Sequence, residues 1–146
     1  SPMSAGKLAD CVSAYAPNYD GVTIVDRRPG DLGWNANLNA SDFVSGANKI
    51  DGRNLGFTNV TPAYIAGNNL QAGSVTPFQN PAAAGVAVGG TVPAGQPVGV
   101  KGATLFASTA SGHSVGTVYV YGDMTLNAPT STKAGLYAGT VTFTIV

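Results

Sequence analysis

Few side chains in this sequence could support catalysis. Residues 112–116 read Gly-His-Ser-Val-Gly and match the G-x-S-x-G pattern of serine nucleophiles. That chemistry requires a helix after the serine and a separate histidine as base. Residues 117–121 are instead β-branched or aromatic, and His113 is the only histidine in the chain. We therefore interpret the segment as a turn and predict that the protein is not an enzyme.

Other reactive side chains also lack the companions that their chemistry would need. Residues 4–7 fit the S-x-x-K pattern of serine acylases, but no companion motif follows and the chain is short for that class. Cys11 is the only cysteine, so it cannot form an internal disulfide, and one cysteine with one histidine cannot build an ordinary zinc site. We interpret Cys11 as an unpaired or buried thiol and predict no cofactor.

Aspartates near turn residues could offer oxygen ligands to calcium, namely Asp26, Asp31, Asp42 and Asp51. No EF-hand spacing is present, so ordinary turn and solubility roles are favoured and no metal site is predicted. A lysine-to-asparagine crosslink, known from surface β-domains of Gram-positive bacteria, needs both residues on neighbouring strands beside a buried acid. The candidate lysines all occur in turn-like contexts, namely Lys49, Lys101 and Lys133.

Composition limits the classes of partner. The 146 residues contain seven Lys or Arg and seven acidic residues, all of them Asp, so the formal net charge is zero. With only 10% charged residues there is no basic stripe for nucleic acid. No run approaches the roughly 20 apolar residues that span a bilayer, so membrane insertion is not expected. The absence of Glu, with 20 Gly and nine Pro, favours β-structure over exposed helices.

The elements that position these side chains show a period of two residues, which is typical of strands. Residues 34–40 alternate Trp34, Ala36, Leu38 and Ala40 with Asn35, Asn37 and Asn39, and predict a half-buried strand. Residues 117–126 place Val118 and Val120 on one face and Tyr119 and Tyr121 on the other, which we expect to be exposed. The C-terminal strand places Val141, Phe143 and Ile145 opposite a solvated row of threonines.

Shorter strands are predicted at 21–26, 41–44, 86–88, 96–100 and 104–108, and one short helix at 61–66. Residues 78–97, rich in Ala, Gly and Pro, form either a long surface loop or a pair of edge strands. Many short strands separated by turn signals indicate an all-β protein. We predict a single-domain antiparallel β-sandwich of Ig-like or Greek-key type over residues 19–146. Residues 1–18 are expected to form a partly extended N-terminal segment.

Three blocks of sequence together carry a resemblance to a known family. They are residues 19–43, which contain Gly33-Trp34-Asn35-Ala36-Asn37-Leu38, residues 54–58, and residues 124–145, which end in Phe143-Thr144-Ile145. These blocks resemble WxL-like (Trp-x-Leu) cell-surface domains of Gram-positive bacteria. The middle of the chain, about 62–111, is unmatched. The family motif reads Trp-x-Leu twice, whereas both copies here are degenerate: Trp34-Asn35-Ala36 and Phe143-Thr144-Ile145.

The resemblance implies a non-catalytic, secreted or surface-exposed bacterial domain that associates with cell-wall polymer or partner surface proteins. An alternative is a structural or adhesive module, such as a stalk, a fimbrial subunit or a self-assembling surface protein. The candidate binding residues are Trp34, Asn35, Asn37, Tyr119, Tyr121 and Phe143. The competing interpretation makes Trp34 a core residue and the two tyrosines structural cross-strand neighbours.

Overall fold

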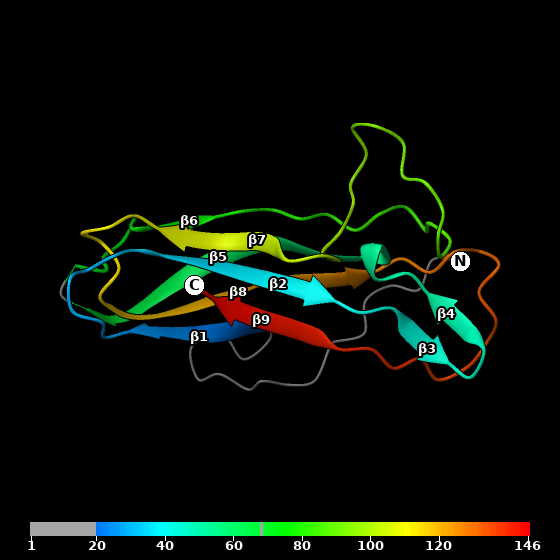
Figure 1. Ribbon diagram of the computed structural model, residues 1–146, viewed down its shortest axis with the longest axis horizontal. Coiled ribbons are helices and arrows are strands. Elements are labelled where there is room, and N and C mark those ends of the chain that lie inside the picture. The colour runs from blue at the N-terminus through cyan, green and yellow to red at the C-terminus, as the bar shows by residue number, and fades with distance from the viewer. Residues whose placement is uncertain (1–19, 68) are drawn as a thin grey trace.

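The computed structural model describes residues 20–67 and 69–146, so the N-terminal segment 1–18, the S-x-x-K match and Cys11 lie outside the described residues. The described chain is built from β-strands and one 3-10 helix (Figure 1). The strands are β1 (Asp20–Asp26), β2 (Trp34–Ala40), β3 (Phe43–Ser45), β4 (Asn48–Ile50), β5 (Leu55–Gly67), β6 (Val75–Pro77), β7 (Thr104–Thr109), β8 (Gly116–Leu126) and β9 (Val141–Ile145), and the 3-10 helix is η1 (Gly52–Asn54).

The strands form two packed sheets, as an antiparallel β-sandwich requires. One sheet has the order β1-β8-β5 and the other has the order β6-β7-β2-β9, and every pairing is antiparallel (Figure 1). Strands β3 and β4 form a separate hairpin near one end of the sandwich. The predicted all-β sandwich is confirmed. No helix in the described ranges is long and apolar enough to cross a membrane.

Strand β2 follows its predicted alternation. Trp34, Ala36, Leu38 and Ala40 are buried, while the intervening asparagines are exposed or half-buried. Because side chains of a strand alternate between its faces, the apolar set lies in the core and the asparagines form the outer surface.

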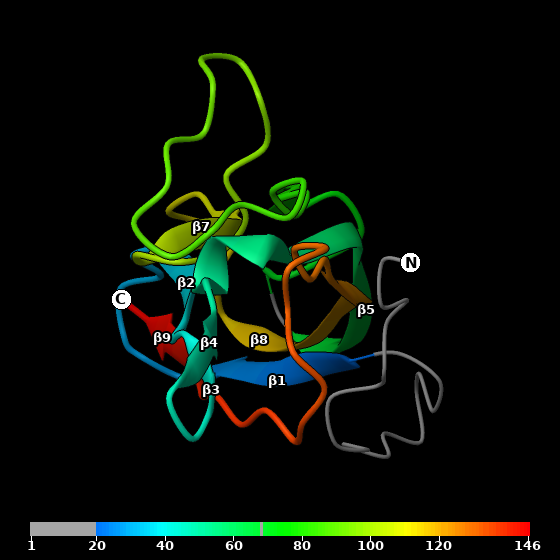
Figure 2. The same ribbon diagram turned by 90° about the vertical axis from the view of Figure 1, so that its right-hand side faces the viewer.

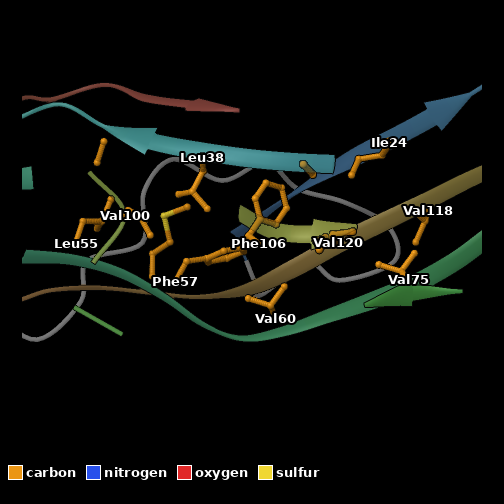
Figure 3. Packing of buried hydrophobic residues seen from close by; sticks show 14 of the residues in the cluster. Ile24, Leu38, Leu55, Phe57, Val60, Val75, Val100, Phe106, Val118 and Val120 are labelled. Carbon is orange, nitrogen blue, oxygen red and sulfur yellow. The ribbon is translucent and has the colours of Figure 1, made fainter. Parts of the chain in front are cut away.

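The core lies between the two sheets and is filled by aromatic and aliphatic side chains. Phe57 of β5, Phe106 of β7 and Leu38 of β2 are fully buried and meet there, together with Val118 and Val120 of β8 (Figure 3). The rings of Phe57 and Phe106 pack edge to face with centroids 5.7 Å apart. Each such side chain contributes roughly 1.5–3 kcal/mol by leaving water, so this cluster holds the sheets together.

Strand β5 is the main departure from the sequence prediction. The helix predicted at 61–66 is wrong, because these residues are part of β5 and pair with β8. The pairing has irregularities between Thr58 and Thr61 and between Tyr64 and Ala66, and Asn59 has a φ of 51°. These interruptions disturb the period of two that would have revealed a 13-residue strand. The short strands β4 and β6 were also not predicted.

Residues 78–103 form a long loop between β6 and β7, and part of it projects from the sandwich (Figures 1 and 2). The loop alternative for 78–97 is therefore confirmed, and the strands predicted at 86–88 and 96–100 are wrong. Asn54 anchors the loop, since its amide group donates to Val86 O at 2.7 Å and accepts from Val86 N at 2.8 Å. Ala83 and Val100 of this segment are buried against the domain, whereas Val88 and Val98 are exposed.

Candidate functional site

Trp34 lies in the core and does not form a surface platform. Its side chain is 3% exposed and belongs to the cluster between the sheets. Its backbone N–H donates to the Thr109 hydroxyl at 3.2 Å, and its indole Nε1 has no partner within the described part of the chain. The interpretation of Trp34 as a packing residue is confirmed, and its ring cannot stack on a ligand at the surface.

Asn35 and Asn37 lie on the outer face of β2, where side chains from four strands form cross-strand rows. One row joins Thr76 of β6, Ser108 of β7 and Asn35. The next rows pair Asn37 with Thr144 and Asn39 with Thr142 of β9. We call these seven residues the Asn/Thr face. None of them is charged, and Leu105 lies beside Asn37 across the β2–β7 pair.

The side chains of Asn35 and Asn37 are available for contacts on the Asn/Thr face. Asn35 is exposed and Asn37 half-buried, and neither side chain has a hydrogen bond to another described residue. Asn39 differs, because its Oδ1 accepts the Gly102 N–H at 2.7 Å. The predicted solvated threonine row is also present, since Thr142 and Thr144 are exposed. Thr76 and Ser108 were not predicted to join this face. Thr76 lies on the three-residue strand β6, and the place of Ser108 beside Asn35 depends on the order of the strands.

The expectation of two exposed tyrosines on β8 is wrong for Tyr119. Tyr119 is 2% exposed and Tyr121 is half-buried, and their rings stack with centroids 5.8 Å apart. Gly21 lies on the neighbouring strand β1, and a Cβ there would come within 2.9 Å of the Tyr119 ring. The absent side chain at Gly21 therefore leaves room for Tyr119 to cover the sheet, and this pair presents little stacking surface.

Phe143 of β9 is half-buried and faces the core. Its ring packs edge to face on Phe106 with centroids 5.6 Å apart. Aromatic pairs of this geometry contribute about 0.5–1.5 kcal/mol beyond their buried area. The contact holds β9 against the rest of its sheet and turns the ring away from the outer face.

The segment that matches G-x-S-x-G is a turn and loop between β7 and β8, so the turn interpretation is confirmed. Ser114 is fully buried, and its hydroxyl donates to Asp31 Oδ1 at 2.7 Å and accepts from Gly33 N at 3.1 Å. Asp31 also accepts from Asn69 Nδ2 at 2.6 Å. The Ser114 hydrogen bond, followed by backbone and Asn69 donors, lowers the pKa of Asp31. Ser114 thus joins two loops at one end of the sandwich.

His113 lies next to Ser114 in sequence but faces a different environment. It is exposed and lines an open hollow of about 540 Å³ together with neutral residues such as Asn69, Gln71 and Ser74. Ser114 is not among the residues that line this hollow. Its polar contacts come from amide and hydroxyl groups and from the His113 ring, and no described Asp, Lys or Arg lines it.

Two buried aspartates pair with arginines two residues later. Asp26 accepts from Arg28 Nε at 3.0 Å and Nη2 at 2.9 Å, and Asp51 accepts from Arg53 in the same way. The Arg28 hydrogen bond lowers the pKa of Asp26 to about 2, against a smaller opposing effect of burial. For Asp51, burial raises the pKa, but the hydrogen bonds from Arg53 and the charge of Lys101 outweigh it and the net pKa is lowered.

Lys101 connects Asp51 to Asp42. Its Nζ lies 2.7 Å from Asp42 Oδ1 and 3.6 Å from Asp51 Oδ2. The hydrogen bond between Lys101 and Asp42 raises the pKa of the lysine and lowers that of the aspartate, so both groups are charged. A charged pair of this kind is a salt bridge, whereas an amide crosslink needs a neutral amine as nucleophile.

The aspartates considered for calcium all accept hydrogen bonds from protein groups, at Asp26, Asp31, Asp42 and Asp51. Within residues 20–67 and 69–146, no group of three or more His, Cys, Asp or Glu is placed to hold a metal ion. These carboxylates therefore have the contacts of turn and ion-pair residues.

The sequence matches no protein-family model, and neither a curated protein nor a solved structure is significantly similar to it. The resemblance to WxL-like domains stays a prediction. Of the six candidate binding residues, the structure brings only Asn35 and Asn37 together on an outer face, while Trp34, Tyr119 and Phe143 serve packing. Tyr121 lies on the other sheet.

Proposed function

We propose that the protein is a non-catalytic, secreted or surface-exposed bacterial domain that associates with cell-wall polymer or partner surface proteins through the Asn/Thr face. The observation that carries the proposal is the set of uncharged polar side chains across β6, β7, β2 and β9. Amides and hydroxyls donate and accept hydrogen bonds, as the hydroxyl and acetamido groups of a neutral glycan do. A face without charge favours a neutral polymer over an anionic one.

The absence of charge makes the proposal testable by salt dependence. Purified cell walls should retain the protein equally at low salt and at about 1 M salt, where the screening length falls to roughly 3 Å. The double variant Asn35→Ala/Asn37→Ala removes two amide groups. Because a hydrogen bond contributes about 1 kcal/mol, retention should fall at least tenfold.

The matched control is Thr23→Ala, which truncates an exposed polar side chain on β1 in the other sheet. It should be retained like the wild type. Wall preparations that do not retain the wild-type protein would count against the wall-binding form of the proposal. Equal retention of the wild type and the asparagine variant would exclude the Asn/Thr face as the binding surface.

A second candidate function is the structural or adhesive module. It is favoured by β9, an uncharged strand at the edge of its sheet, which pairs with β2 alone among the described strands. Edges of this kind are templates for pairing with another chain. Light scattering over a concentration series separates the two functions, because a glycan-binding domain has no need to self-associate.

A further inference from the structure

Strand β9 has one hydrogen-bonding edge that no other strand of residues 20–67 and 69–146 occupies. Val146 and Asn35 exchange hydrogen bonds of 2.8 and 3.0 Å, and Ser41 N donates to Thr140 O at 2.9 Å. Along a strand of an antiparallel pair, residues whose backbone N–H and C=O bond the partner strand alternate with residues whose backbone groups face away from it. The backbones of Thr142 and Thr144 therefore also face β2, and those of Val141, Phe143 and Ile145 face away from it.

The other edge strands of the two sheets carry features that discourage pairing with another chain. Strand β6 has three residues and ends in Pro77, while β5 contains Pro62 and two register irregularities. Strand β1 ends at Asp26, which is paired with Arg28, and the exposed cation Arg27 follows it directly. Short length, proline, irregular register and charge are the usual protections of sheet edges.

Strand β9 has none of these features. It reads Val-Thr-Phe-Thr-Ile, without charge or proline, and its pairing with β2 is regular over all five residues. Ile145 is 42% exposed although it is apolar. The strand also has nearly the same side-chain pattern in both directions about Phe143, so it matches a second copy of itself.

We propose that β9 pairs antiparallel with β9 of a second copy of this chain, about a two-fold axis at Phe143. The inference deepens the structural-module candidate by naming the partner. In this register Val141 lies opposite the partner's Ile145, and Phe143 lies opposite its own copy. All three residues have outward-facing backbone groups, so each forms a fully bonded pair. Thr142 then lies beside the partner's Thr144 on the outer face, and aromatic and threonine pairs are favourable across strands.

The area of contact sets the strength of the association. Five residues extend over about 17 Å, so the pairing buries less than the roughly 1,200 Å² of a standard stable interface. The dimer is therefore weak in dilute solution and is favoured where many copies are held together on a surface. The weight-average mass should rise from monomer toward dimer over roughly 10 μM to 1 mM protein, the range of weak dissociation constants.

The first test changes the charge on the outer face of β9 and measures mass by sedimentation equilibrium. The variant Thr142→Lys/Thr144→Lys places lysine opposite lysine twice, and should remain monomeric to at least tenfold higher concentration. The matched variant Thr142→Asp/Thr144→Lys carries the same number of new charges but places aspartate opposite lysine twice. It should dimerise at least as well as the wild type, and a monomer here would overturn the register.

The second test blocks the edge backbone without disturbing the ladder with β2. Ile145→Pro removes an outward-facing N–H, which proline tolerates on an edge, and should abolish dimerisation. Ile145→Ala keeps the N–H and should retain most of it. Circular dichroism confirms that each variant is folded. If Ile145→Pro is unfolded, the charge pair decides the question alone.

A wild-type protein that stays monomeric at 1 mM would overturn the proposal, as would equal dimerisation of folded Ile145→Pro and Ile145→Ala proteins. Wall retention is measured on the same Ile145→Pro protein, because residue 145 is outside the Asn/Thr face. Loss of the dimer with retained wall binding supports pairing at β9 and keeps the two functions separate. Absence of the dimer in the wild type with retained wall binding overturns only the pairing.

Discussion

Ser114 connects two loops through its buried hydroxyl, and this role is testable at the scale of a single residue. Ser114→Ala leaves the Gly33 N–H without its acceptor and removes a donor to Asp31. An unsatisfied buried polar group costs about 1–3 kcal/mol. We expect the free energy of unfolding to fall by about 1–2 kcal/mol, measured by urea denaturation.

The control for Ser114 is Ser111→Ala, which changes an exposed residue in the same loop and should alter stability by no more than about 0.5 kcal/mol. Ester hydrolysis is measured on both proteins. A hydrolytic activity that disappears in Ser114→Ala while stability is unchanged would contradict the structural role.

A second single substitution tests whether the position of the Tyr119 ring depends on Gly21. A Cβ at residue 21 would lie 2.5 Å from Val120 O and 2.9 Å from the Tyr119 ring. Gly21→Ala should therefore displace the ring and cost about 1–3 kcal/mol, as overpacking does. Near-UV circular dichroism should show a changed tyrosine signal, whereas Thr23→Ala should leave it unaltered. An unchanged spectrum of folded Gly21→Ala would show that Tyr119 does not depend on the glycine.

The sequence predicted the buried residues of β2 in full, whereas on β8 it predicted Val118 and Val120 but missed the burial of Tyr119, for a physical reason. On β2 one face is apolar and the other carries asparagines, so the alternation identifies the buried side. On β8 three consecutive residues, Val118, Tyr119 and Val120, are buried, so the burial of the strand does not alternate there. The signal for Tyr119 is Gly21 on the neighbouring strand, and it becomes visible only once the β1–β8 register is known.

At the scale of elements, the 78–103 loop depends on close backbone approach to the rest of the domain. Gly99 has a φ of +64°, and a Cβ there would collide with Arg53 O and lie 2.5 Å from Leu55 O. Gly95 has a φ of +80° but open space around it. Both positions impose backbone strain on an L-residue, whereas only Gly99 adds a backbone collision.

Comparing Gly99→Ala with Gly95→Ala therefore separates the cost of a positive φ from the cost of the steric collision of a new Cβ with the backbone. Gly95→Ala should lower the free energy of unfolding by about 1–2 kcal/mol, the cost of a left-handed residue. Gly99→Ala should cost at least about 3 kcal/mol, since strain and collision add. Urea denaturation measures both. Equal losses would mean that the loop moves away from η1 and β5 without cost.

The elements predicted correctly are those with an uninterrupted alternation, and β2, β8 and β9 are the clearest. Strand β5 was missed because Asn59 and the register irregularities interrupt its period. Residues 61–66 also resemble a helix start, with Thr61 before Pro62. Pairing with β8 overrides this local preference. The Asn/Thr face was predicted in part, since Asn35, Asn37 and the threonines alternate in sequence, whereas their alignment into rows depends on strand order.

In the molecule as a whole, the net charge is zero, and several of the charged side chains form local ion pairs. Asp26, Asp42 and Asp51 each bind a cationic side chain. Most of the remaining surface of the β6-β7-β2-β9 sheet is uncharged. The charges of Arg28, Arg53 and Lys101 are therefore used in ion pairs within the domain, and strands β6, β7, β2 and β9 carry no charged residue that would repel a partner.

These ion pairs predict how stability depends on pH. The pKa values of Asp26, Asp31, Asp42 and Asp51 are lowered in the folded protein, to about 2 for Asp26. Carboxyls with lowered pKa values stabilise the fold fully above their unfolded value of about 3.9, and this contribution is lost as the pH falls through the folded values. The pKa of Lys101 is raised, so its contribution is full below about 10.4 and is lost at higher pH.

The melting temperature should therefore be nearly constant between about pH 5 and 9 and fall steeply between about pH 4 and 2. Asp26→Asn tests the contribution of the aspartate whose pKa is lowered to about 2, because it removes the carboxylate that accepts hydrogen bonds from Arg28. The free energy of unfolding of this variant at pH 7 should be lower than that of the wild type by about 1–2 kcal/mol, allowing for the solvent exposure of Arg28. Between pH 7 and pH 2 the variant should then lose less free energy of unfolding than the wild type does. Parallel acid profiles for the two proteins would mean that the Asp26–Arg28 pair does not stabilise the fold, and that the other aspartates carry the acid sensitivity.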